Sequence, residues 1–267
     1  MHYWTQESIR LANQFDYLDR LFKIYTISPN ARRTLDPHTL EQISQIYKNP
    51  KRKPGQLLQI LLKQDIFPLK DSYVAYLRRD PSALERNPKT VARLESTLLN
   101  MGLENILLEL TKPIETNRQM GSFFKNWVQQ NFAYPITDDP QVFLAYKGTT
   151  PMIFNASDQA MQNLAQKHFG YKRHKGLDFI AKCGQKIILG EAKFLSDFGG
   201  HQNAQFADAI ATLKSPLDPT PYLVQTIAIL DGVIYIEGQH KMMRTLQSMS
   251  KAIILSALFL PDFLATL

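Results

Sequence analysis

Cysteine is almost absent from this sequence, since Cys183 is the single thiol in 267 residues. One thiol excludes an internal disulfide and a metal site built from several thiolates. Long apolar runs are also missing: no stretch approaches the roughly 18–20 residues of a transmembrane helix, and residues 1–21 lack the apolar core of a signal peptide. We therefore expect no membrane association and a reducing, cytoplasmic location.

Acidic residues are outnumbered, with 24 Asp and Glu against 31 Lys and Arg, which gives a formal net charge of +7 at pH 7. A basic protein suits an anionic partner, and nucleic acid is the leading candidate. The 44% of hydrophobic and 21% of charged residues are typical of a folded chain rather than a disordered one. The length allows one large domain or two small ones.

Residues 1–133 are dominated by helical patterns. Apolar positions recur at a spacing near 3.6, and the segments are separated by Pro, Gly or Asp-Pro. We predict a mainly helical region with a role in DNA recognition or dimerisation. Strand patterns follow at 142–146 and 225–236, so residues 134–267 are predicted to form a catalytic core, which ends in a buried helix within 249–267.

Residues 176–194, GLDFIAKCGQKIILGEAKF, have the pattern of a β-hairpin. Two apolar runs flank a short polar break, and a two-residue loop beginning at Gly184 would form a type II′ turn. This loop places Asp178 opposite Glu191. Because side chains alternate between the faces of a strand, Asp178, Glu191 and Lys193 then share one face, with opposed Cβ atoms roughly 4.5–5.5 Å apart.

Two facing carboxylates destabilise a strand pair unless a positive charge compensates them. Mg²⁺ is a hard cation that prefers oxygen ligands, usually one or two carboxylates together with phosphate and water. Asp178 and Glu191 meet that requirement, and Lys193 is placed to orient or activate a water molecule beside a phosphate. The alternative is a solvent-facing hairpin whose charged side chains have no special role.

The stretch GLDFIAKCGQKIILGEAK resembles the active-site segment of the PD-(D/E)xK nuclease superfamily, and with the following FLSDFGGHQNAQFADA it resembles the type II restriction endonucleases within it. The resemblance covers residues 150–240 approximately. It implies an α/β (α+β) fold, restriction-endonuclease-like, with a mixed central β-sheet flanked by helices and a helical N-terminal half that the resemblance does not explain. Leu177 stands where the name of the superfamily has proline.

The resemblance also implies a mechanism and partners. Asp178, Glu191 and the backbone carbonyl of Ala192 would bind Mg²⁺, and Lys193 would act on the attacking water. The reaction would be sequence-specific hydrolysis of double-stranded DNA to 5′-phosphate and 3′-hydroxyl ends. A homodimer and a companion DNA methyltransferase acting on the same site are the expected partners.

Residues expected to contact DNA lie around this hairpin and on a helix predicted at 116–130. Lys and Arg neutralise phosphate charge, and Asn, Gln and His hydrogen-bond phosphates or bases. For each of them, a solvated loop or a helix cap is the competing interpretation. Glu115 is either a further carboxylate of the site or an acid favoured by the helix dipole. The expected contacts are Arg118, Gln119, Lys172, Arg173, His174, Lys175, His201, Gln202 and Asn203.

Two other functions fit the same residues. A repair or recombination nuclease of the same fold would cut DNA by its structure and not by its sequence. A non-catalytic, basic DNA-binding protein would use the positive charge but not the carboxylates of the hairpin.

Overall fold

The computed structural model of the chain describes residues 1–26, 32–112 and 116–267, and for residues 116–118 only the backbone. Contacts divide the chain into two compact units, Met1–Ile27 with Asn117–Leu267 and, separately, Ser28–Thr116. The second unit is therefore an insertion between two segments that complete the first. We call them the sheet unit and the inserted unit.

A six-stranded sheet organises the sheet unit, in the order β1-β2-β3-β4-β5-β6. The pairs β2–β3 and β3–β4 are antiparallel, whereas the pairs β1–β2, β4–β5 and β5–β6 are parallel. The predicted mixed sheet is thus confirmed. The strands are β1 (Ile136–Thr137), β2 (Met152–Phe154), β3 (Phe179–Cys183), β4 (Lys186–Leu195), β5 (Leu223–Gly232) and β6 (Ile253–Leu255).

The predicted hairpin is formed by β3 and β4, and its register is confirmed. Cys183 pairs with Lys186 and Phe179 pairs with Gly190. Gly184 has a φ of +57°, and in the described ranges Asp16 is the only residue other than glycine with a positive φ. Positive φ is therefore confined to the first central position of the turn, as a type II′ turn requires.

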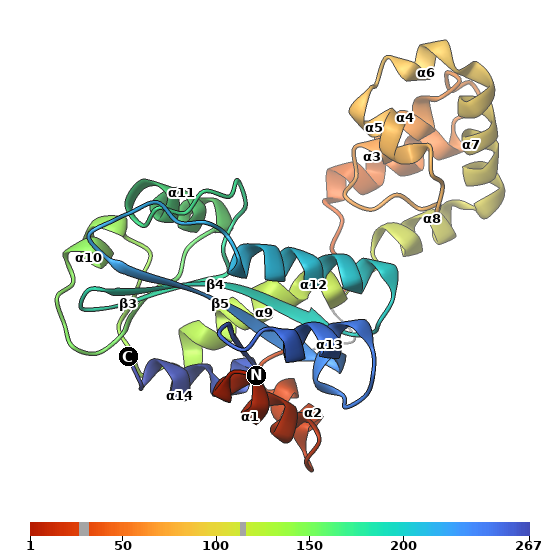
Figure 1. The fold of residues 1–267 in the computed structure, drawn as a ribbon. Coiled ribbons are helices and arrows are strands. Elements are labelled where there is room, and N and C mark those ends of the chain that lie inside the picture. The colour runs from red at the N-terminus through yellow and green to blue at the C-terminus, as the bar shows by residue number, and fades with distance from the viewer. Residues whose placement is uncertain (27–31, 113–115) are drawn as a thin grey trace. The chain divides into compact units, whose positions relative to one another are not determined.

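Helices cover both faces of the sheet (Figure 1). Helices α10, α11 and α12 lie on one face, where Thr226 of β5 donates a hydrogen bond to the Leu213 carbonyl of α12 at 2.7 Å. Helices α1, α9 and α14 lie on the other face. The helices of this unit are α1 (Tyr3–Ala12), α2 (Tyr17–Phe22), α9 (Thr116–Asn131), α10 (Pro140–Ala145), α11 (Asp158–His168), α12 (Gly200–Leu213), α13 (Lys241–Ser248) and α14 (Leu260–Leu264).

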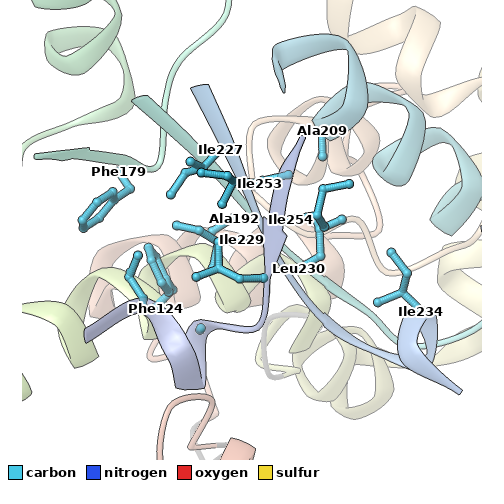
Figure 2. Close-up of a cluster of buried hydrophobic side chains, with 14 of the residues drawn as sticks. Phe124, Phe179, Ala192, Ala209, Ile227, Ile229, Leu230, Ile234, Ile253 and Ile254 are labelled. Carbon is cyan, nitrogen blue, oxygen red and sulfur yellow. The ribbon is translucent and has the colours of Figure 1, made fainter. Parts of the chain in front are cut away.

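The core of the sheet unit is filled from both faces (Figure 2). Phe124 of α9 contacts Phe179 of β3, with ring centroids 6.4 Å apart. Ala209 of α12 is fully buried on the opposite side of the sheet. A small side chain there lets α12 approach β4 and β5 closely, which brings the polar positions of α12 near the hairpin.

The division into units differs from the predicted boundary at residue 133. Helices α1, α2 and α9 precede that residue, yet they pack on the sheet. Thr5 of α1 donates a hydrogen bond to the Ile254 carbonyl of β6 at 2.8 Å, and Leu21 and Phe124 are buried in the same core as the strands. Helical periodicity shows that a segment has an apolar face but not which element covers it.

The inserted unit is helical and has its own apolar core, which includes Leu57, Leu61 and Leu94. The carboxylate of Glu95 accepts hydrogen bonds from the backbone of Gly55 at 2.6 Å and Leu57 at 3.2 Å, so it caps the start of a buried helix. The helices are α3 (Pro37–Lys48), α4 (Gln56–Leu62), α5 (Val74–Arg79), α6 (Ala83–Arg86), α7 (Pro88–Met101) and α8 (Leu103–Leu110).

Two element predictions in the sheet unit were wrong. The strand predicted at 142–146 is helix α10, because Asp139 caps it by accepting hydrogen bonds from the backbone of Gln141 and Val142 and Pro140 begins its first turn. The buried helix predicted within 249–267 is strand β6 followed by the short helix α14. None of the helices in the described ranges has the length and apolarity that a membrane span needs.

Candidate active site

The three charged residues of the hairpin lie together at the start of β3 and the end of β4. Asp178 immediately precedes β3, and its backbone N–H donates to the Gly190 carbonyl at 3.0 Å, so the ladder continues to this residue. The ammonium of Lys193 lies 3.1 Å from Asp178 Oδ2 and 2.5 Å from Glu191 Oε1. The predicted convergence of two carboxylates and one ammonium is therefore present.

The backbone of Ala192 completes this group. Its N–H donates to Asp178 Oδ2 at 2.9 Å, which fixes the orientation of that carboxylate, and its carbonyl accepts from Lys193 Nζ at 2.9 Å. The Lys193 ammonium thus contacts an oxygen of Asp178, of Glu191 and of Ala192. We call these four residues the hairpin cluster.

The hairpin cluster is largely withdrawn from water. The side chain of Glu191 is 1% exposed and that of Lys193 is 21% exposed. Burial by itself lowers the pKa of Lys193, but the charges of Asp178 and Glu191 outweigh it, so that the pKa lies above its usual value. Lys193 is consequently an ammonium at neutral pH and acts as a hydrogen-bond donor.

The oxygens of Glu191 face lysine ammonium groups, which bears on metal binding. The ammonium groups of Lys193 and Lys175 lie 2.5 and 2.7 Å from Oε1, and no backbone N–H or hydroxyl in the described part of the chain donates to either oxygen. A buried carboxylate whose partners are lysine ammonium groups, and not fixed backbone donors, suits a hard cation. Residues 1–26, 32–112 and 116–267 contain no group of three or more His, Cys, Asp or Glu placed to hold a metal, so a cation here would depend on two carboxylates, the Ala192 carbonyl, water and phosphate.

A second lysine, Lys175, joins the hairpin cluster to α12. Its ammonium lies 2.7 Å from Glu191 Oε1 and also forms an ion pair with Asp208. Arg173 binds the same Asp208 through Nη2 at 2.9 Å and donates a further hydrogen bond to Thr212 Oγ1. Two members of the basic run, residues 172–175, are therefore tied to α12.

A family model described as the Tsp45I type II restriction enzyme matches residues 2–267. This chain belongs to that family. The resemblance to type II restriction endonucleases is thereby confirmed over essentially the whole chain, the inserted unit included, and the protein is a sequence-specific DNA endonuclease of a restriction-modification system. No match was found among curated proteins or among solved structures.

In this Tsp45I-family enzyme the remaining residues of the basic run are at the surface. Lys172 forms an ion pair with Asp218 at 2.5 Å, and both side chains are at least half exposed. His174 is exposed as well. These two side chains remain accessible to a ligand that approaches the hairpin cluster.

The start of α12 is divided between exposed and buried side chains. His201 is exposed and its ring lies 3.1 Å from the Gln205 amide, and Asn203 donates to the carbonyl of Phe198 at 2.6 Å. Gln202 is only 2% exposed. Its amide binds the backbone and hydroxyl of Ser196 at 3.4 and 3.1 Å, so it stabilises the loop between β4 and α12 instead of facing DNA as predicted.

The other predicted contacts lie on or before α9. Gln119 is partly buried in that helix. The side chain of Arg118 and all of Glu115 lie outside the described residues. For these two positions the prediction stands as it was made.

Asp208 is a member of the site that the sequence patterns missed. It lies on α12, whose sequence GHQNAQFADAIATL contains no other Asp, Glu, Lys or Arg. A lone carboxylate among small and apolar residues of one helix is a usable signal, because such a residue rarely lies next to a packed sheet without a cationic partner.

Proposed function

We propose that the hairpin cluster is the catalytic centre of this restriction enzyme and that it hydrolyses DNA phosphodiesters with Mg²⁺, giving 5′-phosphate and 3′-hydroxyl ends. The observation that supports this most strongly is the contact of one buried ammonium, that of Lys193, with oxygens of Asp178, Glu191 and Ala192. These oxygens converge on a single cationic position. The family match favours this function over a structure-specific repair nuclease or a non-catalytic DNA-binding protein.

Each residue of the hairpin cluster has a distinct role in this proposal. Asp178, Glu191 and the Ala192 carbonyl would hold Mg²⁺, which when bound lowers the pKa of water and compensates developing charge on the phosphate. The hydrogen bond from the Ala192 N–H keeps Asp178 oriented. Lys193, as a donor, orients the attacking water and a phosphate oxygen.

The DNA-facing surface in this proposal includes Lys172 and His174, whose exposed side chains alternate in the sequence with Arg173 and Lys175. His201 and Asn203 at the start of α12 extend it. The Lys172 ammonium attracts phosphate, and the His and Asn side chains can hydrogen-bond to it, without selecting a base. The side chains that read the recognition sequence then belong to other parts of the enzyme, for which the inserted unit is our candidate.

The enzyme is proposed to act as a homodimer in the cytoplasm, beside a methyltransferase that protects the same sites. An exposed apolar surface around α2 supports the dimer, because Phe15, Leu18 and Phe22 are 93%, 69% and 55% exposed. Leu18 also borders a hollow of about 430 Å³ whose other walls include Phe194 and Ile236. One surface that holds both protruding side chains and a hollow suits a two-fold contact.

The proposed centre is tested with Asp178→Asn and Lys193→Met, each of which removes a charge at nearly constant size. We expect both to lower the rate of plasmid cleavage in Mg²⁺ by about 10²–10³-fold and to keep DNA binding in the absence of metal. Lys186→Met, at the solvent-exposed start of the same strand, is the matched control and should cut like the wild type.

Cut sites are mapped on sequenced DNA before the variants are compared, so that cleavage is measured at a defined site. Discrete fragments are expected from the family. An unchanged cutting rate in Asp178→Asn or Lys193→Met would remove the hairpin cluster as the catalytic centre.

A further inference from the structure

The charges around the hairpin cluster already balance without any bound metal. Three carboxylates and three cationic side chains lie within one continuous chain of ion pairs. A cation that enters must therefore compete with the resident side chains rather than fill a purely negative site. The six residues are Asp178, Glu191 and Asp208, and Arg173, Lys175 and Lys193.

Lys175 is the cation in this chain that can leave Glu191 most readily. Lys193 belongs to β4 itself and is held by three oxygens. Lys175 instead lies in the loop before β3, its side chain is 28% exposed, and it has a second anionic partner in Asp208. Its ammonium can move away from Glu191 without losing all its compensation.

We infer that Lys175 is the resident counter-ion of Glu191 and that its ammonium must leave Oε1 before that carboxylate can bind a divalent cation. This inference rests on the proposed function, because it assumes that Glu191 is a metal ligand. Lys175 is a positioning residue in this account. It lowers the metal affinity of the enzyme when no DNA is present.

DNA changes this competition through its phosphate. A phosphate beside the hairpin cluster adds negative charge to a balanced site, and it offers a new acceptor to the Lys175 ammonium once this leaves Glu191. Metal and DNA should then bind cooperatively, since each lowers the cost of the other. The link to α12 through Asp208 keeps Lys175 close to the site throughout.

The test measures divalent binding to the full-length, DNA-free protein by calorimetry, with Mg²⁺ and with Mn²⁺ as probes. Lys175→Met removes the competing charge and should tighten the dissociation constant by about tenfold. Lys175→Arg keeps the charge and should bind like the wild type. Lys172→Met removes a charge from the same loop, where its partner is Asp218 and not Glu191, and should also bind like the wild type.

Asp178→Asn, made in the wild type and in the Lys175→Met background, separates the two ways of failing. If Asp178→Asn weakens binding but Lys175→Met does not strengthen it, the role of Lys175 is overturned and the metal site stands. If Asp178→Asn changes metal binding in neither background, the proposed metal site is contradicted, and the role inferred for Lys175 is contradicted with it. A misfolded Lys175→Met variant cannot imitate the expected result, because loss of structure does not produce tighter binding.

Discussion

The two faces of the central sheet each carry a buried acid, and the two acids have different kinds of hydrogen-bond and ion-pair partners. Glu191 on the α12 face is 1% exposed and Asp231 on the opposite face is fully buried. Glu191 is bound by the ammonium groups of Lys175 and Lys193, and no backbone N–H or hydroxyl in the described part of the chain donates to it. Asp231 accepts from three neutral donors, the hydroxyls of Tyr25 and Ser256 and the backbone N–H of Ala257.

This difference is the reason why we propose Glu191, and not Asp231, as a residue of the catalytic centre. Fixed donors hold Asp231 in one position and join β5 to the segment after β6 and to Tyr25, which follows α2. Lysine side chains can move, so the oxygens of Glu191 can exchange partners. A buried carboxylate held by lysine ammonium groups is therefore the better candidate for a reactive residue at this sheet.

The largest expected effect compares the two acids directly. Glu191→Gln should reduce the cleavage rate by about 10²–10³-fold, because the amide is a poor metal ligand and removes one of the two carboxylates that compensate each ammonium group. Asp231→Asn should cut within about threefold of the wild type when rates are divided by the concentration of folded protein, as expected for a residue remote from the reaction. A similar loss of cleavage rate in both variants would contradict the proposal that the acid on only one face of the sheet takes part in the reaction.

The pH dependence of stability should follow Asp231. Burial raises the pKa of this carboxyl to about 6 from a usual 3.8, while its three hydrogen bonds act in the opposite direction. Between these values the folded protein binds more protons than the unfolded chain, so the stabilising effect is complete below pH 3.8 and is lost as pH rises through about 6. The free energy of unfolding of the wild type, relative to Asp231→Asn, should fall by roughly 3 kcal/mol over this range.

Urea unfolding at several pH values, followed by tryptophan fluorescence, measures this difference. Both tryptophans, Trp4 and Trp127, lie in the sheet unit, so the signal reports the unit that contains Asp231. A constant difference between wild type and variant from pH 4 to pH 7 would contradict the assignment.

The smallest expected effect concerns one hydrogen-bond donor of Asp231, the hydroxyl of Tyr25. Tyr25→Phe removes the hydroxyl that lies 2.7 Å from Asp231 Oδ2 and keeps the ring that packs on Phe194. We expect a loss of about 1–3 kcal/mol in unfolding free energy and no change in cleavage rate. Thermal unfolding and plasmid cleavage of the same preparation check both, and a cleavage defect without a stability loss would connect this face to the reaction.

The hairpin was predictable because its information is local. The glycine at 184 determines the turn, the turn determines the register, and strand alternation then places Asp178, Glu191 and Lys193 on one face. The reason given for a metal was incomplete, however. Two lysines already compensate the facing carboxylates, so repulsion between the acids does not by itself require a divalent ion.

The partners of the hairpin were not predictable, since they depend on packing between distant segments. Asp208 contacts Lys175 only because α12 packs on the face of β4 that carries Glu191. Strand β6 has three residues, too few to show an alternation, and it is defined by its pairing with β5. The division into units depends on which element each helix packs against, and helical periodicity in the sequence does not contain that information.

The insertion of residues 28–116 within the sheet unit has a consequence for synthesis. Thr5 and its acceptor Ile254 are 249 positions apart in the sequence. Helix α1 therefore cannot form its contact with β6 until the inserted unit and all six strands have been synthesised. Contacts this distant form late, after the loop between them has closed. The sheet unit therefore gains its full structure only when translation has passed β6, and unfinished chains lack the complete scaffold of the proposed catalytic centre.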